Sequence, residues 1–317
     1  MEAVRGGRRR HALSAPQSRR HQHGHCTWTD RGRNTRYFGN GLRRAHEKVR
    51  LAFSTATSER SAGVLHADRS SHAQVMLQSL TYSLPVQTFI CLTDAYCVFL
   101  DLKRDLYLSI ERWRIEAVSS RLYGWPCQLS DAVDERHTSS CEVARILDEL
   151  VKNDLLVESS AESKECKPTE LTLARTTIFD RHRKGSLHSC LHSGVPMVWA
   201  AARAARTLKT RTTEQTVERV LRRKALHSGG AHEFDLELAR EIVTTFNTLR
   251  YMLPHNYLCL FDSLALLECF ARHQLFPDWV FGVQAEPFEA HCWLQHRDIL
   301  INDQVERVRR YVPIMSV

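Results

Sequence analysis

The chain of 317 residues is long enough for two domains of ordinary size, which excludes a single small module. Hydrophobic residues make up 43% and charged residues 25%, so the chain is neither wholly disordered nor collagen-like. The net charge of +8 comes from one end: residues 1–75 contain 15 Lys and Arg against 5 Asp and Glu, and the remaining 242 residues contain 29 against 31. The charge is therefore no evidence that the body of the chain binds nucleic acid.

The N-terminus, the apolar stretches and the cysteine spacing predict the cellular compartment of the protein. The basic N-terminus is not followed by the apolar run that a secretory signal requires. The most apolar stretches, around residues 89–102 and 195–205, are interrupted by Asp or Arg and are too short to span a membrane. The 10 cysteines show no disulfide-like spacing. We therefore predict a cytoplasmic protein with reduced thiols and no membrane association, in which a catalytic cysteine is possible.

Residues 1–75 are rich in Arg, His, Gly and Ser and lack apolar periodicity, so they are predicted to be a disordered basic tail. Because Met76 opens the first segment with a globular pattern, we hypothesise that translation starts there and that the tail is not translated. A peptide from residues 30–70 of the native protein would contradict this. The tail contains one group of potential metal ligands, His21, His23, His25 and Cys26. No second group follows at a zinc-finger interval, so no metal site is predicted.

Residues 76–157 are predicted to form a winged-helix-like α+β module. Three runs rich in Val, Ile, Phe, Tyr and Thr have strand composition and span residues 84–92, 95–102 and 105–110. Two-residue connections at 93–94 and 103–104 predict tight hairpins and a three-stranded antiparallel meander. Further on, Ser139 or Ser140 can cap a helix whose apolar residues recur at helical spacing: Val143, Ile146, Leu147 and Leu150.

The polar composition of residues 158–175 predicts a linker over 158–190 and a second domain over 191–317. In that domain, composition and apolar spacing predict helices over residues 195–226, 236–249 and 259–273. Strands are predicted at 279–284, 288–295 and 298–301. A helical half followed by an antiparallel sheet is an α+β arrangement, so the whole chain is predicted to be α+β.

Three residues of this domain could form a nucleophilic site. Cys259 stands at the start of a predicted helix, where the helix dipole stabilises a thiolate. Alternation along the strand 288–295 separates His291 from Cys292, and antiparallel pairing with the next strand would bring Asp303 near His291. A thiol, a base and a carboxylate that orients the base are the parts of a catalytic triad. Each residue also has an ordinary interpretation, because Cys on a helix is most often a small core residue and Asp303 suits a turn.

Five segments resemble the B proteins of lasso-peptide biosynthesis, a family of transglutaminase-like cysteine proteases that remove the leader from a precursor peptide. They are residues 259–267 (CLFDSLALL), 280–283 (VFGV), 287–295 (PFEAHCWLQ), 300–303 (LIND) and 311–314 (YVPI). The intervals of 32 and 12 residues from Cys259 to His291 and on to Asp303 fit the order and spacing of the family. The resemblance covers residues 195–317 and implies a catalytic triad of Cys259, His291 and Asp303 in a transglutaminase/papain-like cysteine protease domain. Cys269 and Cys292 are expected to take no part in the chemistry.

The resemblance also implies that residues 76–157 are a leader-peptide recognition element. In this family the leader adds as a strand to the edge of the third strand and lies against a helix. The implied contacts are Leu106, Tyr107 and Leu108 of the strand and Leu147 and Leu150 of the helix. No short motif marks this groove, and residues 1–75 have no counterpart in the family.

The implied function is hydrolysis of the amide bond between leader and core of a precursor peptide, in partnership with an asparagine-synthetase-like lasso cyclase. Family members are described as ATP-dependent, but the chain has no G-x-x-x-x-G-K-[ST] loop, so no cofactor is bound by a recognisable motif. Two alternatives stay open: an acyltransferase that uses the same triad, and a non-catalytic winged-helix nucleic-acid-binding protein. The near-neutral body argues against the second.

Overall fold

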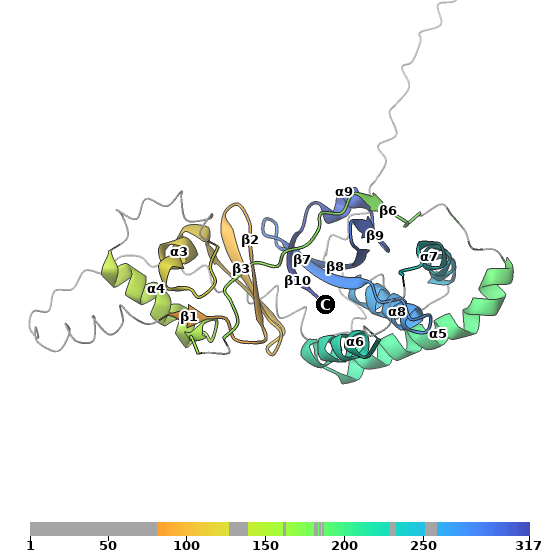
Figure 1. The fold of residues 1–317 in the computed structure, drawn as a ribbon, viewed down its shortest axis with the longest axis horizontal. Coiled ribbons are helices and arrows are strands. Elements are labelled where there is room, and N and C mark those ends of the chain that lie inside the picture. The colour runs from red at the N-terminus through yellow and green to blue at the C-terminus, as the bar shows by residue number, and fades with distance from the viewer. Residues whose placement is uncertain are drawn as a thin grey trace, which may run out of the picture. The chain divides into compact units, whose positions relative to one another are not determined.

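The computed structural model describes residues 81–126, 139–160, 163–180, 183, 185, 187–227, 233–250 and 259–317 (Figure 1). They form a mixed α and β structure, as predicted. The tail of residues 1–75, with the group at residues 21–26, and the proposed start at Met76 lie outside the described residues.

The N-terminal elements are β1 (Tyr82–Ser83), β2 (Thr88–Leu92), β3 (Tyr96–Asp101), β4 (Leu106–Glu111), α3 (Arg112–Ala117), η2 (Ser119–Arg121), α4 (Ser140–Lys152) and β5 (Val157–Glu158). The predicted antiparallel meander is confirmed, because β2, β3 and β4 form a sheet in that order. Short β1 pairs with β5. The helix predicted near Ser139 is also confirmed: the Ser139 hydroxyl accepts a hydrogen bond from the Glu142 amide and caps α4.

The two-residue turns predicted for the meander are wrong in length. Three residues separate β2 from β3, and four separate β3 from β4. The longer turn is held by the Asp101 carboxylate, which accepts a hydrogen bond from the Arg104 amide, and Asp105 takes the left-handed conformation that closes it (φ 53°). Arg104 also donates to the carbonyl of Asn153 beyond α4, so the turn ties the sheet to this helix.

Both faces of the meander are buried, which explains its nearly continuous apolar sequence. One face, with Ile90, Cys97 and Phe99, packs against α3 and α4. The other face, with Val98, Leu100 and Tyr107, belongs to the same apolar cluster as helices α5 to α8. The N-terminal sheet is therefore a packing partner of the C-terminal part of the chain. Whether it is a winged-helix module stays a prediction.

The C-terminal elements are β6 (Thr176–Thr177), α5 (Leu187–Thr210), α6 (Thr213–His227), α7 (Leu236–Arg250), α8 (Cys259–Ala271), β7 (Asp278–Gln284), β8 (Glu289–His296), β9 (Ile299–Leu300), α9 (Val305–Val308) and β10 (Val312–Ser316). The single helical stretch expected over 195–226 is two helices. They separate at Thr212, whose hydroxyl accepts from the Gln215 amide while the Gln215 side chain accepts from the Thr212 amide. This reciprocal capping box starts α6.

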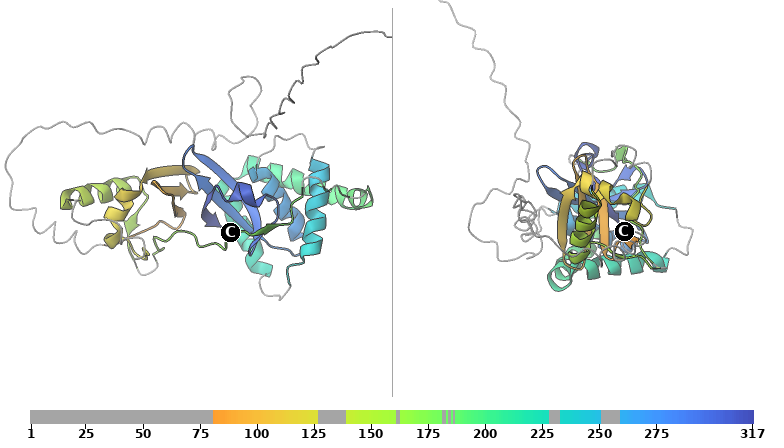
Figure 2. Two further views of the ribbon diagram at one scale, coloured as in Figure 1. Left: turned by 90° about the horizontal axis from the view of Figure 1, so that it is seen from above. Right: turned by 90° about the vertical axis from the view of Figure 1, so that its left-hand side faces the viewer.

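A five-stranded sheet in the order β10-β7-β8-β9-β6 carries the C-terminal part (Figures 1 and 2). The predicted strands 279–284, 288–295 and 298–301 correspond to β7, β8 and the shorter β9. On one face, Phe281, Cys292 and Leu294 pack with the helices α5, α7 and α8. On the other, Val280 and Trp293 pack with α9 and Tyr311. The segment predicted as a linker supplies β6, which pairs in parallel with β9, so it is part of this sheet. The division of the chain into domains stays a prediction.

Gly282 lies where the sheet has no room for a side chain. It is paired with His291, and a Cβ atom at this position would lie 2.8 Å from the Trp293 ring and 3.1 Å from the Tyr311 Cβ. We expect Gly282→Ala to lower the free energy of unfolding by about 1–3 kcal/mol, measured by urea denaturation. The matched control is Gly194→Ala in α5, where the nearest atom is Leu249 Cδ1 at 3.9 Å and Ala should stabilise the helix by about 0.5–1 kcal/mol. Equal stabilities for wild type and Gly282→Ala would contradict this packing.

Candidate active site

Cys259 is the first residue of α8 and is half-buried, whereas the ten residues that follow Leu260 are all buried. The helix is apolar on every side because it passes between the sheet and helices α5 and α7. Its first turn therefore brings the thiol to the sheet while the positive end of the helix dipole favours a thiolate. The predicted helix start at Cys259 is confirmed.

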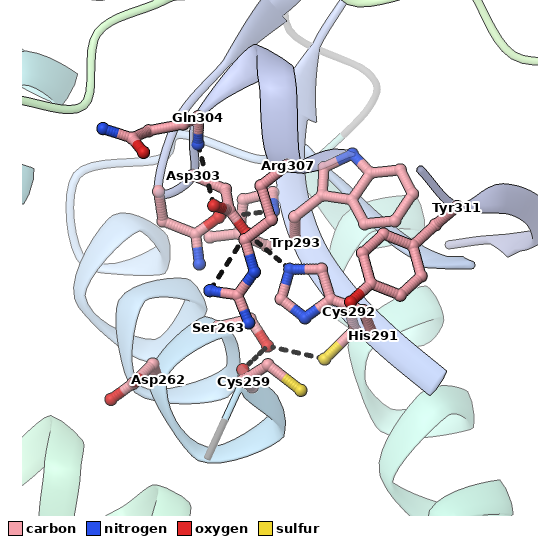
Figure 3. Close-up of polar contacts among 12 residues, drawn as sticks. Cys259, Asp262, Ser263, His291, Cys292, Trp293, Asp303, Gln304, Arg307 and Tyr311 are labelled. Atoms are coloured by element: carbon pink, nitrogen blue, oxygen red, sulfur yellow. Dashed lines mark hydrogen bonds and ion pairs between the residues drawn. The ribbon is translucent and has the colours of Figure 1, made fainter. Parts of the chain in front are cut away.

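His291 in β8 is hydrogen-bonded to Asp303 through Nε2 and Oδ2, as Figure 3 shows. The two side chains are 4% and 7% exposed, so water does not screen their interaction. The expected proximity of these residues is confirmed, and β9 explains it. This short strand pairs with β8 only at Gln295 and His296, after which the chain turns back and places Asp303 beside His291. The bond to Nε2 leaves Nδ1 on the side of Cys259 (Figure 3).

The thiol of Cys259 contacts both His291 and Cys292. The pKa of Cys259 lies well below its usual range, because hydrogen bonds from the Cys292 thiol and from His291 and the nearby positive charge of His291 outweigh the effect of burial. Burial lowers the pKa of His291, but the hydrogen bonds to Asp303 and Cys259 raise it to about 9. Both pKa shifts favour a thiolate beside an imidazolium at neutral pH, which is the reactive form of a cysteine nucleophile.

Asp303 is held as a carboxylate by several donors. Burial raises its pKa, but the hydrogen bond to His291 and the charges of His291 and Arg307 lower it below its ordinary value. The Gln304 amide donates to the free oxygen Oδ1 at 2.8 Å, and Arg307 Nη1 lies 4.0 Å from Oδ2. The Thr177 hydroxyl of β6 donates to the Asp303 carbonyl at 2.7 Å. The segment predicted as a linker thus helps to fix this carboxylate.

Two aromatic rings enclose the imidazole. The Tyr311 ring lies 5.0 Å from the His291 ring, and the Trp293 ring lies 5.9 Å away on the same face of β8. The Tyr311 hydroxyl donates to Glu289 Oε2 at 2.9 Å. These rings restrict the imidazole to the orientation in which it bridges Cys259 and Asp303.

Cys292 and Ser263 are residues of the site that the sequence did not reveal. The Ser263 hydroxyl lies 3.4 Å from the Cys292 sulfur, donates to the Cys259 carbonyl at 2.7 Å and accepts from Trp279 Nε1 at 3.0 Å. It therefore fixes Cys292 beside Cys259 (Figure 3). The expectation that Cys292 takes no part in the chemistry stays a prediction, although its thiol contacts that of Cys259. Side chains alternate along β8, so Cys292 and His291 lie on opposite faces of this strand. The face that carries Cys292 is the one against which α8 packs. The periodicity of one strand cannot show this.

The structure places the implied leader contacts in two different environments, an edge strand and the buried core. Leu106, Tyr107 and Leu108 lie on β4, an edge strand of the meander among the described residues. Leu147 and Leu150 are 3% and 2% exposed in the core between α4 and the sheet. These two side chains are therefore not on a surface that a peptide could contact. A leader-binding role of the five residues stays a prediction.

The ion pair between Cys259 and His291 predicts how the reactivity of the Cys259 thiol depends on pH. We expect the rate of alkylation of Cys259 by iodoacetamide to be already at its plateau at neutral pH and to fall only in acid, where the low-pKa thiolate is protonated. In His291→Ala the loss of this stabilisation should move the fall to higher pH. Peptide mapping by mass spectrometry separates Cys259 from exposed Cys141, an internal reference. A wild-type rate that rises through the ordinary thiol range, unchanged in His291→Ala, would contradict the ion pair.

Comparisons with known proteins identify the C-terminal part. Residues 191–316 match the family described as the transglutaminase-like superfamily, which includes cysteine peptidases and acyltransferases. Searches of curated proteins and of solved structures found no match. Among the residues that the structure describes, no helix has the length and apolar character needed to cross a membrane. Residues 191–316 are therefore a transglutaminase-like superfamily domain, and Cys259, His291 and Asp303 all lie within it.

Proposed function

We propose that the chain is a cysteine peptidase that cleaves the leader from a ribosomally made precursor peptide of the lasso type. The observation that supports it most is the buried relay from Cys259 through His291 to Asp303 in a transglutaminase-like domain. The resemblance of residues 259–267 and 287–295 to the leader peptidases of this pathway supports the substrate class.

The proposed mechanism follows from the protonation states. The Cys259 thiolate attacks the carbonyl carbon of the scissile amide, and the His291 imidazolium gives its Nδ1 proton to the leaving amine of the core peptide. This leaves the leader as a thioester on Cys259 and His291 neutral. His291 then takes a proton from water, which attacks the thioester and releases the leader as a carboxylic acid. Asp303 keeps Nε2 as the donor nitrogen throughout and stabilises the imidazolium.

An acyltransferase would use the same thioester but would pass the leader to an amine instead of water. The candidate substrate is a precursor peptide of the lasso type, and mass spectrometry of its products separates the two reactions. We expect a leader with a free carboxylate even when a primary amine such as putrescine is in excess. A leader–amine conjugate as the main product would show that the enzyme is a transferase and not a peptidase, with the same triad.

The free edge of β4 is the proposed leader site. The backbone amide of Arg112, just after β4, donates to the Ala95 carbonyl on the side of β3. Along a strand, the backbone N–H and C=O groups of every second residue point to the same side, so those of Leu106, Leu108 and Ile110 are also directed to β3. Those of Tyr107 and Ser109 therefore point away from the sheet, and no other described strand pairs with them. A leader added along this edge would complete the sheet by β-augmentation.

The position of this edge relative to the thiol supports the proposal. The Tyr107 side chain is 9% exposed, and its ring lies 5.6 Å from that of Phe288, the residue just before β8. Burial raises the pKa of Tyr107, and the charge of the Cys259 thiolate adds to this shift, so the thiolate lies within electrostatic range of the tyrosine. The edge strand and the nucleophile are thus close enough for one peptide to reach both.

We expect Ser109→Pro to weaken leader binding by about tenfold or more, because proline removes an outward N–H from the edge. Ser109 is preferable to Tyr107 for this test, since Tyr107 is part of the apolar core. The matched control is Ser109→Ala, which loses the hydroxyl but keeps the N–H and should bind like wild type. The measurement is fluorescence anisotropy of labelled leader peptide. Equal affinities for the two variants would exclude strand addition at this edge.

ATP dependence and a cyclase partner come from the resemblance alone. The acyl transfers described above balance without a nucleotide, so no step of the proposal needs one.

A further inference from the structure

A cavity of about 720 Å³ lies among helices α5, α6 and α8, at the opposite end of α8 from Cys259. Its lining includes Trp199, Arg203, Arg206, Arg223, Glu268 and Arg272. None of these residues belongs to the relay or to the β4 edge. In Figure 1 the three helices lie together.

The cavity has an excess of positive charge. Glu268 is 7% exposed and is shared by three guanidinium groups. Arg223 pairs with it through both terminal nitrogens at 3.0 and 3.1 Å, and Arg203 and Arg219 lie at 3.4 and 3.5 Å. One carboxylate cannot neutralise three cations. Arg206 and Arg272 add two exposed guanidinium groups, and neither has an acidic partner among the residues that the structure describes.

Large apolar surface lies beside this charge. The Trp199 side chain is 71% exposed, which is unusual for so large an aromatic residue. Pro196, Ala200 and Ala271 continue the apolar lining. Indole and guanidinium groups together are the residue types enriched at the energetic centres of protein–protein interfaces.

The backbone around the cavity argues against a compact phosphate as its occupant. Phosphate sites use backbone amides at helix N-termini. Here Arg223 lies one turn before the C-terminal end of α6 at His227, and Glu268 lies in the last turn of α8, which ends at Ala271. These C-terminal ends carry partial negative charge and repel a concentrated dianion. Carboxylates spread along a peptide can meet the dispersed guanidinium groups one at a time.

We propose that this cavity binds an acidic amphipathic segment of a partner protein, with its carboxylates on Arg203, Arg206 and Arg272 and an apolar side chain on Trp199. The area is separate from the relay, so the site serves association and not bond cleavage.

The test uses the full chain and two labelled synthetic peptides of equal length and charge, one of Glu and Leu in a helical amphipathic pattern and one of Glu and Ser. The second peptide measures the attraction of the basic residues 1–75, which does not depend on apolar side chains. Fluorescence anisotropy should show the Glu–Leu peptide binding about tenfold tighter than the Glu–Ser peptide. Arg206→Glu with Arg272→Glu should abolish this preference, and Trp199→Ala should reduce it.

Arg222→Glu is the matched control, because Arg222 is exposed on the same helix as Arg223 but does not line the cavity. It should retain the preference. Circular dichroism melting shows whether the double variant is folded, and Trp199→Ala gives an independent result if it is not. Equal affinities for the two peptides would overturn the proposal, as would a preference that survives both the charge reversal and Trp199→Ala. Displacement of the Glu–Leu peptide by inorganic pyrophosphate at a lower concentration than by glutarate would assign the cavity to phosphate instead.

Discussion

Replacement of Cys259 or of His291 by alanine is expected to abolish cleavage of the precursor peptide, with a loss of roughly 10³-fold or more in rate for each. Cys259 supplies the attacking sulfur, and His291 supplies both its positive partner and the proton for the leaving amine. Because the two act as a unit, the double variant should be no slower than either single variant. Leader binding should be unchanged, since the proposed recognition edge is a separate strand. Cleavage is measured by liquid chromatography and mass spectrometry of the products.

Cys269→Ala is the matched control for Cys259→Ala. Cys269 lies on the same helix, is 4% exposed and packs in the apolar core, and burial raises its pKa to about 12. Its replacement should cost some stability but leave the rate within a few-fold of wild type. The cleavage rate of Cys292→Ala is expected to lie between those of Cys259→Ala and Cys269→Ala, because the Cys292 thiol stabilises the Cys259 thiolate without reacting itself. A Cys259→Ala variant that cleaves as fast as Cys269→Ala would show that another residue is the nucleophile.

Asp303→Asn should reduce the rate by about 10²- to 10⁴-fold while leaving the fold intact. The amide has nearly the shape of the carboxylate but no negative charge, so it stabilises the imidazolium poorly. The pKa of His291, about 9 beside the carboxylate, should fall toward its ordinary value. The alkaline limb of the pH–rate profile, where His291 loses its proton, should therefore move to lower pH.

Asp298→Asn is a suitable control, because Asp298 lies in the turn between β8 and β9 and contributes its backbone carbonyl to Arg175 and Thr176. Its pH–rate profile should coincide with that of wild type. If Asp303→Asn slows the reaction but keeps the alkaline limb near pH 9, Asp303 would act on the structure and not on the protonation of His291.

Much of the C-terminal fold could be predicted because its signals are local. The start of α8 at Cys259 and the extent of β7 and β8 follow from periodicity and strand composition. The meeting of His291 with Asp303 follows from one hairpin, since β8 and β9 are neighbours in the sequence. Cys259 could be assigned to the same site only through the resemblance, because α8 and β8 meet by long-range packing.

The features that were missed depend on contacts between distant segments. β6 is only two residues long and follows a polar stretch, and its pairing with β9 exists only because the rest of the sheet is already formed. The hairpin lengths were misjudged because side-chain hydrogen bonds such as that of Asp101 extend the turns. Leu147 and Leu150 were assigned to a binding groove from the resemblance, whereas the apolar face of α4 is what covers the meander.

The central claim is that Cys259 forms a thioester with the leader during peptide-bond cleavage. The most direct measurement is to mix the protein with its precursor, quench the reaction in acid within its first turnover, and map the digested protein by mass spectrometry. The account predicts an adduct on Cys259 with the mass of the leader minus one water, which is absent in Cys259→Ala and absent or far slower to appear in His291→Ala. Release of core peptide at the wild-type rate with an adduct on a different cysteine, or undiminished release by Cys259→Ala, would contradict it.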